Sequence, residues 1–491
     1  MPALRSVPLE QSVQVETCDV CIMGAGLAGL NALFVASQYL SRDQKIILLD
    51  RRRRVGGMWV DTYPYVRLHQ PHGMFTAGNI EWTLGAKRSY LATKGEVLDH
   101  FEYCLEVIKQ RVRVDELFGW ELQSDQEIGD KVRIKCRSLD GKRLVVEADR
   151  LIKAYGFGVT PNDPLEFSSA RVKSVSPDSC DVRNGDMRTS DSPVWIVGGG
   201  KTAMDTAHAL TTECPGREVN LVAGAGTYFL NRDRLFPTGV RRWWGGIPAS
   251  NLAREAGRRF DGTNEEEVAG WLRTHYGVWS APETANLLFG VLSGSENDTI
   301  SAGLNDVIMD YLVDVVDHGV VTELKFRSGA TRAVAPASWV VNCTGYILQD
   351  GQPYEPYVSD SGAVLSIQPR SATLHLTSLM AYFLTHLLFL GNITDVPLYE
   401  LDAQDIRSKS RAASPYTLLS LVQHNISLIM DSIPTKVFLD CGVNWDRWYP
   451  LPRRMIANAG FMRAHRRERE HCRRALDTVR ERFDIRCGPV V

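Results

Sequence analysis

The sequence predicts an α/β fold in which two sheets of mainly parallel strands are followed by a helical C-terminal region. Twice in the chain, an apolar strand runs into a glycine-rich turn that opens a helix, first over residues 18–34 and again over residues 194–205. Near the C-terminus, residues 463–482 mix arginines with acidic side chains, which is typical of a solvated helix. A chain of 491 residues has room for two or three domains, so we expect each glycine turn to have its own sheet.

The composition is that of an ordinary globular protein. Apolar residues make up 44% of the chain, and 56 basic side chains nearly cancel 58 acidic ones, which argues against a nucleic-acid partner. The first 17 residues contain no secretory signal, and the longest apolar stretch, residues 380–390, is too short to span a bilayer. Ten dispersed cysteines indicate reduced thiols, and we therefore expect a cytoplasmic protein whose oligomeric state stays open.

The first glycine turn has the spacing of a Rossmann-like dinucleotide-binding site. Gly24 permits the tight turn, Gly26 lets the backbone approach a pyrophosphate, and Gly29 lets the helix pack closely on its strand. The helix that opens there offers free N–H groups to phosphates. The next strand ends in Asp50, about 20 residues beyond the glycines, where a carboxylate binds the ribose hydroxyls.

The residues after Asp50 narrow the nucleotide to FAD. A glycine pair, Gly56 and Gly57, lets the backbone pass close to a second phosphate or to the ribityl chain. Met58 and Trp59 follow directly, and Trp59 is placed to stack near the flavin ring. Four arginines, residues 51–54, separate the two motifs, and we interpret most of them as a solvated loop, with Arg51 beside the adenosine.

The second glycine turn predicts a nicotinamide site. Gly198 and Gly200 form the turn, and Lys201 and Thr202 add phosphate-binding groups. The following strand ends in Ala223, so no ribose-binding residue stands at its usual place. Arg232 and Arg234 lie downstream within reach of a 2′-phosphate, and we therefore expect NADPH, with NADH as the alternative.

A third apolar segment, residues 339–346, ends in Thr344 and Gly345 and has a counterpart at residues 151–156. Each segment is predicted to carry the chain across the junction between the two nucleotide domains. Pro161 and Pro164 follow the earlier one and favour an extended linker.

Together these motifs resemble the two-dinucleotide-binding-domain flavoproteins, and most of all the class B flavin monooxygenases. That group includes N-hydroxylases, heteroatom-oxidising flavin monooxygenases and Baeyer–Villiger monooxygenases. The matching residues are the turn at 24–29, Gly56 to Trp59, the run from Tyr63 to Arg67, the turn at 198–203 with Asp205, and Cys343 to Tyr346. The resemblance implies FAD in the first domain, NAD(P)H in the second, and insertion of one oxygen atom into a small organic substrate through a flavin C4a-(hydro)peroxide.

By the same resemblance, residues 66–79 lie along the flavin ring. Within them, His69, Gln70, His72 and Asn79 carry side chains that donate hydrogen bonds. His69 is expected to contact the cofactor, whereas Gln70, His72 and Asn79 are the catalytic candidates. Asn79 is the foremost of these, because an amide in this region stabilises the hydroperoxide in related monooxygenases.

Two departures from the family pattern bear on the reaction. The family linker usually carries a Phe-x-Gly fingerprint followed by a His, whereas residues 165–174 contain no His. Tyr155 also stands where the family usually has Thr. Because the linker fingerprint is missing, we place N- or S-oxygenation slightly ahead of Baeyer–Villiger oxidation.

The expected layout has a tail at residues 1–14, an FAD-binding domain at 15–165 and 335–400, a nicotinamide domain with an insertion at 190–334, and a mainly helical region at 401–491. Residues 95–109 predict an amphipathic helix, and residues 131–152 predict a hairpin around Asp140 and Gly141. The insertion carries four tryptophans that are either core or part of a substrate wall, and we favour core: Trp243, Trp244, Trp271 and Trp279.

Other activities find less support in the sequence. Cys18 and Cys21 form a C-x-x-C pair, but it falls on the buried first strand, ahead of the phosphate turn, so we reject a thioredoxin-reductase-like role. No His/Cys cluster has metal-ligand spacing, and the Gly-Lys-Thr of the second turn lacks the earlier glycine of a P-loop. Two alternatives remain: a flavin oxidase or dehydrogenase that needs no nicotinamide, and a non-catalytic binding protein on the same fold.

Overall fold

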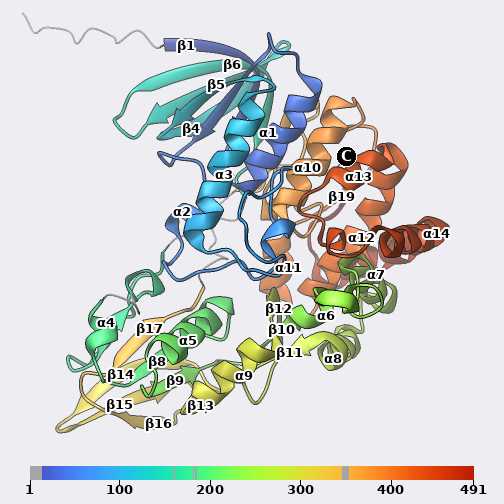
Figure 1. The fold of residues 1–491 in the computed structure, drawn as a ribbon. Helices are drawn as coiled ribbons and strands as arrows, with labels where there is room; N and C mark the ends of the chain where they lie inside the picture. Colours follow the sequence, from blue (N-terminus) through green and yellow to red (C-terminus); the bar gives the residue numbers. More distant parts are fainter. Residues whose placement is uncertain are drawn as a thin grey trace, which may run out of the picture.

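The computed structural model describes residues 14–156, 159, 161–180, 182, 185–345 and 353–490. Three regions are visible in Figure 1: a first sheet with its helices at the top, a second sheet at the lower left, and a group of helices on the right. The mixed α/β architecture with two parallel-strand sheets confirms the predicted fold class.

The first sheet has seven strands, and its centre is parallel. Strands β3, β2, β1, β6 and β18 pair in parallel in that order, and β5 and β4 continue from β6 as an antiparallel meander. The strands are β1 (Gln14–Met23), β2 (Lys45–Asp50), β3 (Arg113–Phe118), β4 (Trp120–Ile128), β5 (Lys131–Ser138), β6 (Arg143–Lys153) and β18 (Val364–Ser366). In the sequence, β18 comes after all the strands of the second sheet, yet it pairs with β6 of the first sheet. The second sheet is therefore inserted within the chain segments that form the first.

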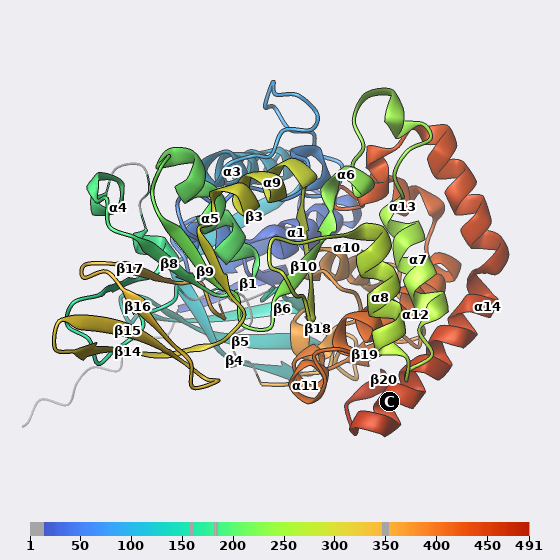
Figure 2. The same ribbon diagram turned by 90° about the horizontal axis from the view of Figure 1, so that it is seen from below.

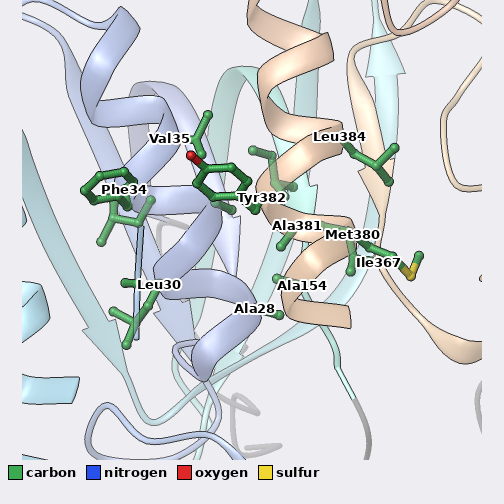
Figure 3. Close-up of a cluster of buried hydrophobic side chains, with 14 of the residues drawn as sticks. Ala28, Leu30, Phe34, Val35, Ala154, Ile367, Met380, Ala381, Tyr382 and Leu384 are labelled. Carbon is green, nitrogen blue, oxygen red and sulfur yellow. The ribbon is translucent and has the colours of Figure 1, made fainter. Parts of the chain in front are cut away.

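Helices cover one face of the first sheet. They are α1 (Leu27–Tyr39), α3 (Lys94–Lys109) and α10 (Thr377–Phe389), which share a hydrophobic cluster with β1, β2 and β6. The short helix α2 (Met58–Asp61), which contacts α3, and the 3-10 turn η1 (His72–Met74) lie in the segment between β2 and α3. Helix α3 matches the predicted amphipathic helix and begins with a capping box between Thr93 and Glu96. The apolar stretch at residues 380–390 forms α10, which is buried nearly all round against α1, with Ala28, Ala154 and Ala381 packed together between them (Figure 3).

The second sheet is parallel throughout, in the order β13, β9, β8, β17 and β7. Its elements, with the neighbouring meander β14 to β16, are β7 (Lys173–Val175), η2 (Pro177–Ser179), α4 (Asp186–Thr189), β8 (Val194–Val197), α5 (Lys201–Glu213), β9 (Val219–Val222), α9 (Gly294–Gly303), β13 (Asp306–Ile308), β14 (Leu312–His318), β15 (Val321–Phe326), β16 (Thr331–Val334) and β17 (Trp339–Asn342). The return to the first domain expected at residue 335 is too early, because β17 still pairs with β8 and β7.

The insertion and the C-terminal region form one body. Their buried side chains share a hydrophobic cluster, and α12 packs on both α7 and α14 (Figure 2). The elements are β10 (Thr227–Asn231), α6 (Arg232–Leu235), η3 (Gly239–Arg242), α7 (Ala249–Arg259), α8 (Glu265–Tyr276), β11 (Gly277–Val278), β12 (Asn286–Leu292), η4 (Pro369–Ser371), β19 (Tyr399–Leu401), α11 (Ala403–Lys409), α12 (Ser414–Ser432), α13 (Thr435–Asp440), η5 (Trp445–Trp448), α14 (Leu451–Phe483) and β20 (Cys487–Pro489). Helix α14 contains the predicted helix at residues 463–482.

The four tryptophans of the insertion do not behave as expected. Trp271 packs against the shared cluster, but Trp243, Trp244 and Trp279 are exposed. The expectation that they are core residues is wrong for these three, because they lie in loops and turns that leave the packed helices.

Within the described ranges, none of the helices is long and apolar enough to cross a membrane.

We predict that Gly78→Ala destabilises the protein by about 1–3 kcal/mol more than Gly129→Ala. Both glycines have positive φ, at 52° and 63°, so both substitutions carry backbone strain. A Cβ at Gly78 would lie 2.0 Å from the Phe34 ring, whereas nothing lies within 4 Å at Gly129. Urea unfolding of the two variants measures the difference, and equal losses would contradict the packing of this loop on α1.

Candidate functional site

The first glycine turn is a cradle that only glycine fits. Gly24 has φ of 102°, and a Cβ there would lie 2.4 Å from the carbonyl oxygen of Ala154. A Cβ at Gly29 would lie 1.6 Å from the carbonyl oxygen of Gly24. Gly26 caps helix α1 without a side-chain hydrogen bond, so the first N–H groups of α1 carry no side-chain cap. An uncapped helix N-terminus behind a glycine turn is suited to a diphosphate.

Asp50 and the glycine pair close around this cradle. The buried Asp50 carboxylate accepts hydrogen bonds from the backbone N–H of Ala25 at 2.6 Å and of Arg52 at 2.8 Å. A Cβ at Gly26 would lie 3.2 Å from Cα of Gly57, so the two glycine segments are in backbone contact. The arrangement fits a dinucleotide whose ribose lies at the end of β2.

The other residues expected around FAD have different surroundings. Arg51 is exposed next to Asp50, and Met58 is partly buried at the start of α2. Trp59 is buried in the core, where its ring meets Phe75 edge-on at 5.7 Å between centroids.

The segment before α10 adds polar groups that the sequence analysis missed. Figure 3 shows α1 and α10 side by side and running in the same direction, so their N-termini lie at the same end. Helix α10 also begins without a side-chain cap. Four buried polar atoms in the segment leading to it have no hydrogen-bond partner among the described residues: Gln368 Oε1, Ser371 Oγ, Thr373 Oγ1 and His375 Nδ1. Burial lowers the pKa of His375 to about 4.

Unsatisfied buried polar atoms are costly, and their concentration beside two helix N-termini fits a polar ligand group at this place. The alternation of small polar residues over residues 366–378, between apolar stretches, was the available sequence signal.

The second turn repeats the construction of the first. Gly198 has φ of 131°, and a Cβ there would lie 2.7 Å from the carbonyl oxygen of Cys343, as Gly24 meets Ala154. Gly200 caps α5 without a side-chain hydrogen bond. Thr202 is buried in the first turn of α5, and the Lys201 ammonium bonds the Asp205 carboxylate one turn along the helix. The residues fit a second dinucleotide, except that β9 is followed by Ala223, which has no polar side chain.

A cavity of about 630 Å³ opens beside the loop that follows β9. It is lined by Ala225, Arg273, Thr274, Trp279, Pro282, Glu283, Thr284 and Ala285. The exposed Arg273 guanidinium, held by the Thr284 carbonyl at 3.2 Å, is a cation near the strand end where the sequence shows none. Arg273 lies on α8, 50 residues after Ala223 in the sequence, so the sequence alone could not place it near this strand end.

Two tyrosines of the first domain reach helix α5 of the second. The Tyr63 hydroxyl donates to the Asp205 carboxylate at 2.8 Å, and the Tyr65 hydroxyl bonds the Thr206 hydroxyl at 2.8 Å. Burial raises the pKa of both tyrosines well above the usual value, and Asp205 adds to the effect at Tyr63. These neutral hydroxyls hold the two domains together beside the second turn.

His69 lies between the domains, among charged groups. Its Nδ1 accepts a hydrogen bond from the Val291 N–H at 3.3 Å, so the ring proton is on Nε2. Arg232 donates to the His69 carbonyl at 3.2 Å and pairs with Glu296 at 2.7 Å. Burial, with the positive charges of Lys201 and Arg232, lowers the pKa of His69 to about 3. His69 is therefore a neutral donor at physiological pH.

The three catalytic candidates of the same segment are not brought together. Gln70 is buried, and its Oε1 has no hydrogen-bond partner among the described residues. His72 is buried, and its Nδ1 lies 3.0 Å from the Tyr90 carbonyl. Asn79 is exposed and donates to Asp440 at 3.4 Å, so the structure does not support the expected role in a water-free site.

A stacked aromatic pair beside His72 was not foreseen. Trp82 stacks on His100 with ring centroids 3.9 Å apart, and the edge of His72 meets Trp82 at 5.3 Å. His100 is buried against Thr76, and burial lowers its pKa to about 3. The partners are 10 to 28 residues apart in the chain, with no periodicity that links them.

The two strand ends at the junction carry the expected turns. Thr344 bonds Asn342, and its carbonyl accepts from Asn162 in the linker. Gly345 has φ of 65° with open space around it, and Gly156 has the same φ. Tyr346 lies outside the described residues.

The cysteines offer no accessible redox pair. Cys18 and Cys21 are both buried on β1, and burial raises the pKa of Cys18 to about 12 and that of Cys21 well above its usual value. The described part of the chain contains no cluster of three or more His, Cys, Asp or Glu side chains that could hold a metal ion.

Residues 18–237 match the family model of the pyridine nucleotide-disulphide oxidoreductases. With the two parallel sheets and their two glycine turns, this match confirms the broader predicted resemblance, that to the two-dinucleotide-binding-domain flavoproteins. The chain has the fold of a two-dinucleotide-binding-domain flavoprotein. An uncharacterized protein of Mycobacterium tuberculosis is 28% identical over 243 residues, covering 45% of this chain and 41% of that protein. An uncharacterized protein of Mycobacterium bovis matches with the same values.

Several solved structures are similar to this flavoprotein-like chain. A flavin-containing monooxygenase from Stenotrophomonas maltophilia is 14% identical, with 77% of this chain and 99% of that one covered and a TM-score of 0.47. Cyclohexanone monooxygenase is 14% identical, with coverages of 91% and 98% and a TM-score of 0.49. Bacillithiol disulfide reductase from Staphylococcus aureus is 11% identical, with coverages of 77% and 99% and a TM-score of 0.44. The names describe different reactions.

We predict that His69→Gln reduces the acid sensitivity of the fold. Because the folded-state pKa of about 3 lies below the ordinary value of 6.5, the unfolded chain binds the extra proton between these pH values, and acid favours unfolding. Removing the group reduces the slope of unfolding free energy against pH by up to about 1.4 kcal/mol per pH unit. Urea titrations between pH 5 and 8 measure the slope. His318→Gln, at an exposed position on β14, is the control, and an unchanged slope in His69→Gln would contradict the buried neutral ring.

Proposed function

We propose that this protein is an FAD-dependent, NAD(P)H-using monooxygenase that inserts one oxygen atom into a small organic substrate. The observation that carries the proposal is the duplicated cradle. In each domain a positive-φ glycine packs on the carbonyl that follows a neighbouring strand, in front of an uncapped helix. A chain with two such cradles is built to hold two dinucleotides at once.

In the first domain, the turn from Gly24 to Gly29, Asp50 and Gly57 would hold FAD. FAD bound there would supply the electron transfer and the activation of oxygen that side chains do not provide. The dipoles of α1 and α10 favour negative charge at their shared end, which suits a diphosphate and an electron-rich ring edge. The polar atoms of Gln368, Ser371, Thr373 and His375 would then find partners.

In the second domain, Lys201 and Arg232 would bind the phosphates of the nicotinamide nucleotide, and Arg273 would bind its 2′-phosphate. The neutral His69 between Lys201 and Arg232 offers its Nε2–H without adding a third positive charge. The preference for NADPH over NADH rests on Arg273, because a guanidinium binds a phosphate strongly and a ribose hydroxyl weakly.

Oxygen insertion is favoured over disulfide reduction by the cysteines. A reductase of this fold needs a thiol pair that its substrate can reach, whereas Cys18 and Cys21 are buried with raised pKa values. The buried Gln70 and His72 also supply polar groups away from bulk water, which an oxygenating site requires. The resemblance of the sequence motifs to the class B flavin monooxygenases supports the same choice.

One observation favours a second candidate, a flavin oxidase or dehydrogenase without a nicotinamide step. Strand β12 of the insertion passes the second turn, where a Cβ at Gly200 would contact the Leu288 side chain at 3.6 Å. Together with the apolar end of β9, this leaves less polar surface for a dinucleotide than in the first domain.

We predict that Asp50→Asn weakens FAD binding by at least about tenfold. The substitution removes the negative charge of the side chain. It also replaces one carboxylate oxygen with an NH₂ group, which cannot accept the hydrogen bond from the backbone N–H of Ala25 or Arg52. Equilibrium dialysis of FAD against apoprotein measures the dissociation constant. The control is Asp140→Asn, because Asp140 is exposed and paired only loosely with Arg53 at 3.8 Å. A colourless wild-type protein that takes up no FAD would favour the non-catalytic alternative.

We predict that NADPH bleaches the bound flavin under anaerobic conditions, as recorded by stopped-flow absorbance. Arg273→Ala should raise the NADPH concentration for half-maximal bleaching about tenfold, with a smaller change for NADH. Arg258→Ala, at an exposed arginine of the neighbouring helix α7, serves as the control. If neither nicotinamide nucleotide bleaches the flavin but an organic substrate does, the oxidase alternative is correct.

A further inference from the structure

A concentrated apolar surface lies where the loop after α6 meets the N-terminal end of α14. Its large apolar side chains are exposed, and we name them, with the arginines described below, the Trp–Arg surface: Val240, Trp243, Trp244, Leu451, Met455, Ile456 and Met462. Trp244 is 72% exposed and Ile456 is 75% exposed, values unusual for such residues. Leu451, Met455 and Met462 fall on one face of the helix, since they are separated by four and seven residues.

The two parts of this surface are fixed to each other. The Arg453 guanidinium donates to the carbonyls of Arg242 at 3.1 Å, Gly245 at 2.6 Å and Gly246 at 2.8 Å. Arg242 in turn donates to the Trp448 carbonyl at 2.9 Å. The loop and the helix end are therefore one rigid unit, and the exposed tryptophans are held outward rather than left on a free chain. Figure 2 shows the loop standing out at the edge of the molecule beside α14.

The same surface is strongly cationic. Burial is the main cause of the lowered pKa of Arg88. The positive charges of three neighbouring arginines lower it further: Arg242, Arg447 and Arg454. Arg241 and Arg463 add two exposed guanidinium groups. The nearby carboxylate of Asp446 is buried and bonded to Ser250, at 3.2 Å from its backbone N–H, so it does not face outward.

We propose that the Trp–Arg surface binds the face of an anionic lipid bilayer. Tryptophan side chains favour the membrane–water interface, where their apolar rings and polar N–H are both satisfied. A helix face with Leu, Met and Ile beside arginines is typical of elements that lie in the headgroup region. The arginine charges complement anionic headgroups.

A flat bilayer fits this surface better than a protein partner does. The exposed apolar side chains belong to a loop that projects from the molecule in Figure 2 and to the N-terminal end of α14. Within the described ranges, no salt bridge of 4.0 Å or less joins Arg88, Arg241, Arg242, Arg447, Arg454 or Arg463 to a carboxylate, although Arg454 interacts electrostatically with the buried Asp446. A like surface of a second copy would therefore bring guanidinium groups together at a cost in energy.

Vesicle flotation of the full-length protein tests this proposal. We expect binding to phosphatidylcholine vesicles that contain roughly 30% phosphatidylglycerol, little binding to pure phosphatidylcholine, and weaker binding as salt is raised. The double variant Trp243→Ser/Trp244→Ser should lower the partition coefficient at least about tenfold. Arg241→Gln/Arg463→Gln should lower binding to anionic vesicles while leaving the low binding to neutral vesicles unchanged.

The matched control is Val313→Ser/Val320→Ser, which removes two apolar side chains, 64% and 89% exposed, on the distant β14–β15 hairpin. It should bind like the wild type. Absence of binding to anionic vesicles, or equal binding by the tryptophan variant, would overturn the proposal. A third outcome would also overturn it: the wild type does not bind vesicles but self-associates in analytical ultracentrifugation, and the tryptophan variant does not self-associate. A second copy of the chain would then cover the surface. Neither readout depends on flavin or nicotinamide binding.

Discussion

The contact between backbone atoms at each glycine turn is the constraint on which the rest of the molecule depends. At Gly24 the chain comes so close to the carbonyl of Ala154 that a single added carbon would collide with it, and Gly198 meets Cys343 in the same way. This closeness brings a helix N-terminus to the carboxyl end of each sheet. Because the two contacts are equivalent, the strand–turn–helix unit is built alike in the two domains, and the relative position of the domains decides what lies between them.

That relative position is set by the segment from Tyr63 to His69. Tyr63 and Tyr65 bond helix α5 of the second domain, and His69 is fixed between strand β12 and Arg232. All three side chains are neutral, although they lie beside Lys201 and Asp205. A charged group at these positions would have to lose its water without a matched partner, which is far more costly than burying a hydroxyl or a neutral imidazole.

Local patterns explain why the sequence was sufficient for the two turns and not for the site between them. A strand, a glycine turn and a helix are adjacent in the chain, so the residues at 24–29 and 198–203 carry their own signal. Exposure depends on which distant elements pack against a residue. This is why three of the four insertion tryptophans were placed wrongly and why the exposure of Asn79 was not predicted. Arg273 and the stack of Trp82 on His100 are likewise assembled from positions without sequence periodicity.

The insertion shows how one addition to the fold affects several surfaces at once. Its strand β12 contacts the second glycine turn through Leu288, while its helix α7 packs on α12 and shares a hydrophobic cluster with the C-terminal helices. The cluster joins side chains more than 150 residues apart, so the insertion and the C-terminal region stabilise each other rather than folding as separate additions. The same body therefore carries both β12, which contacts the second turn, and the Arg453 anchor, which holds the outer loop on α14.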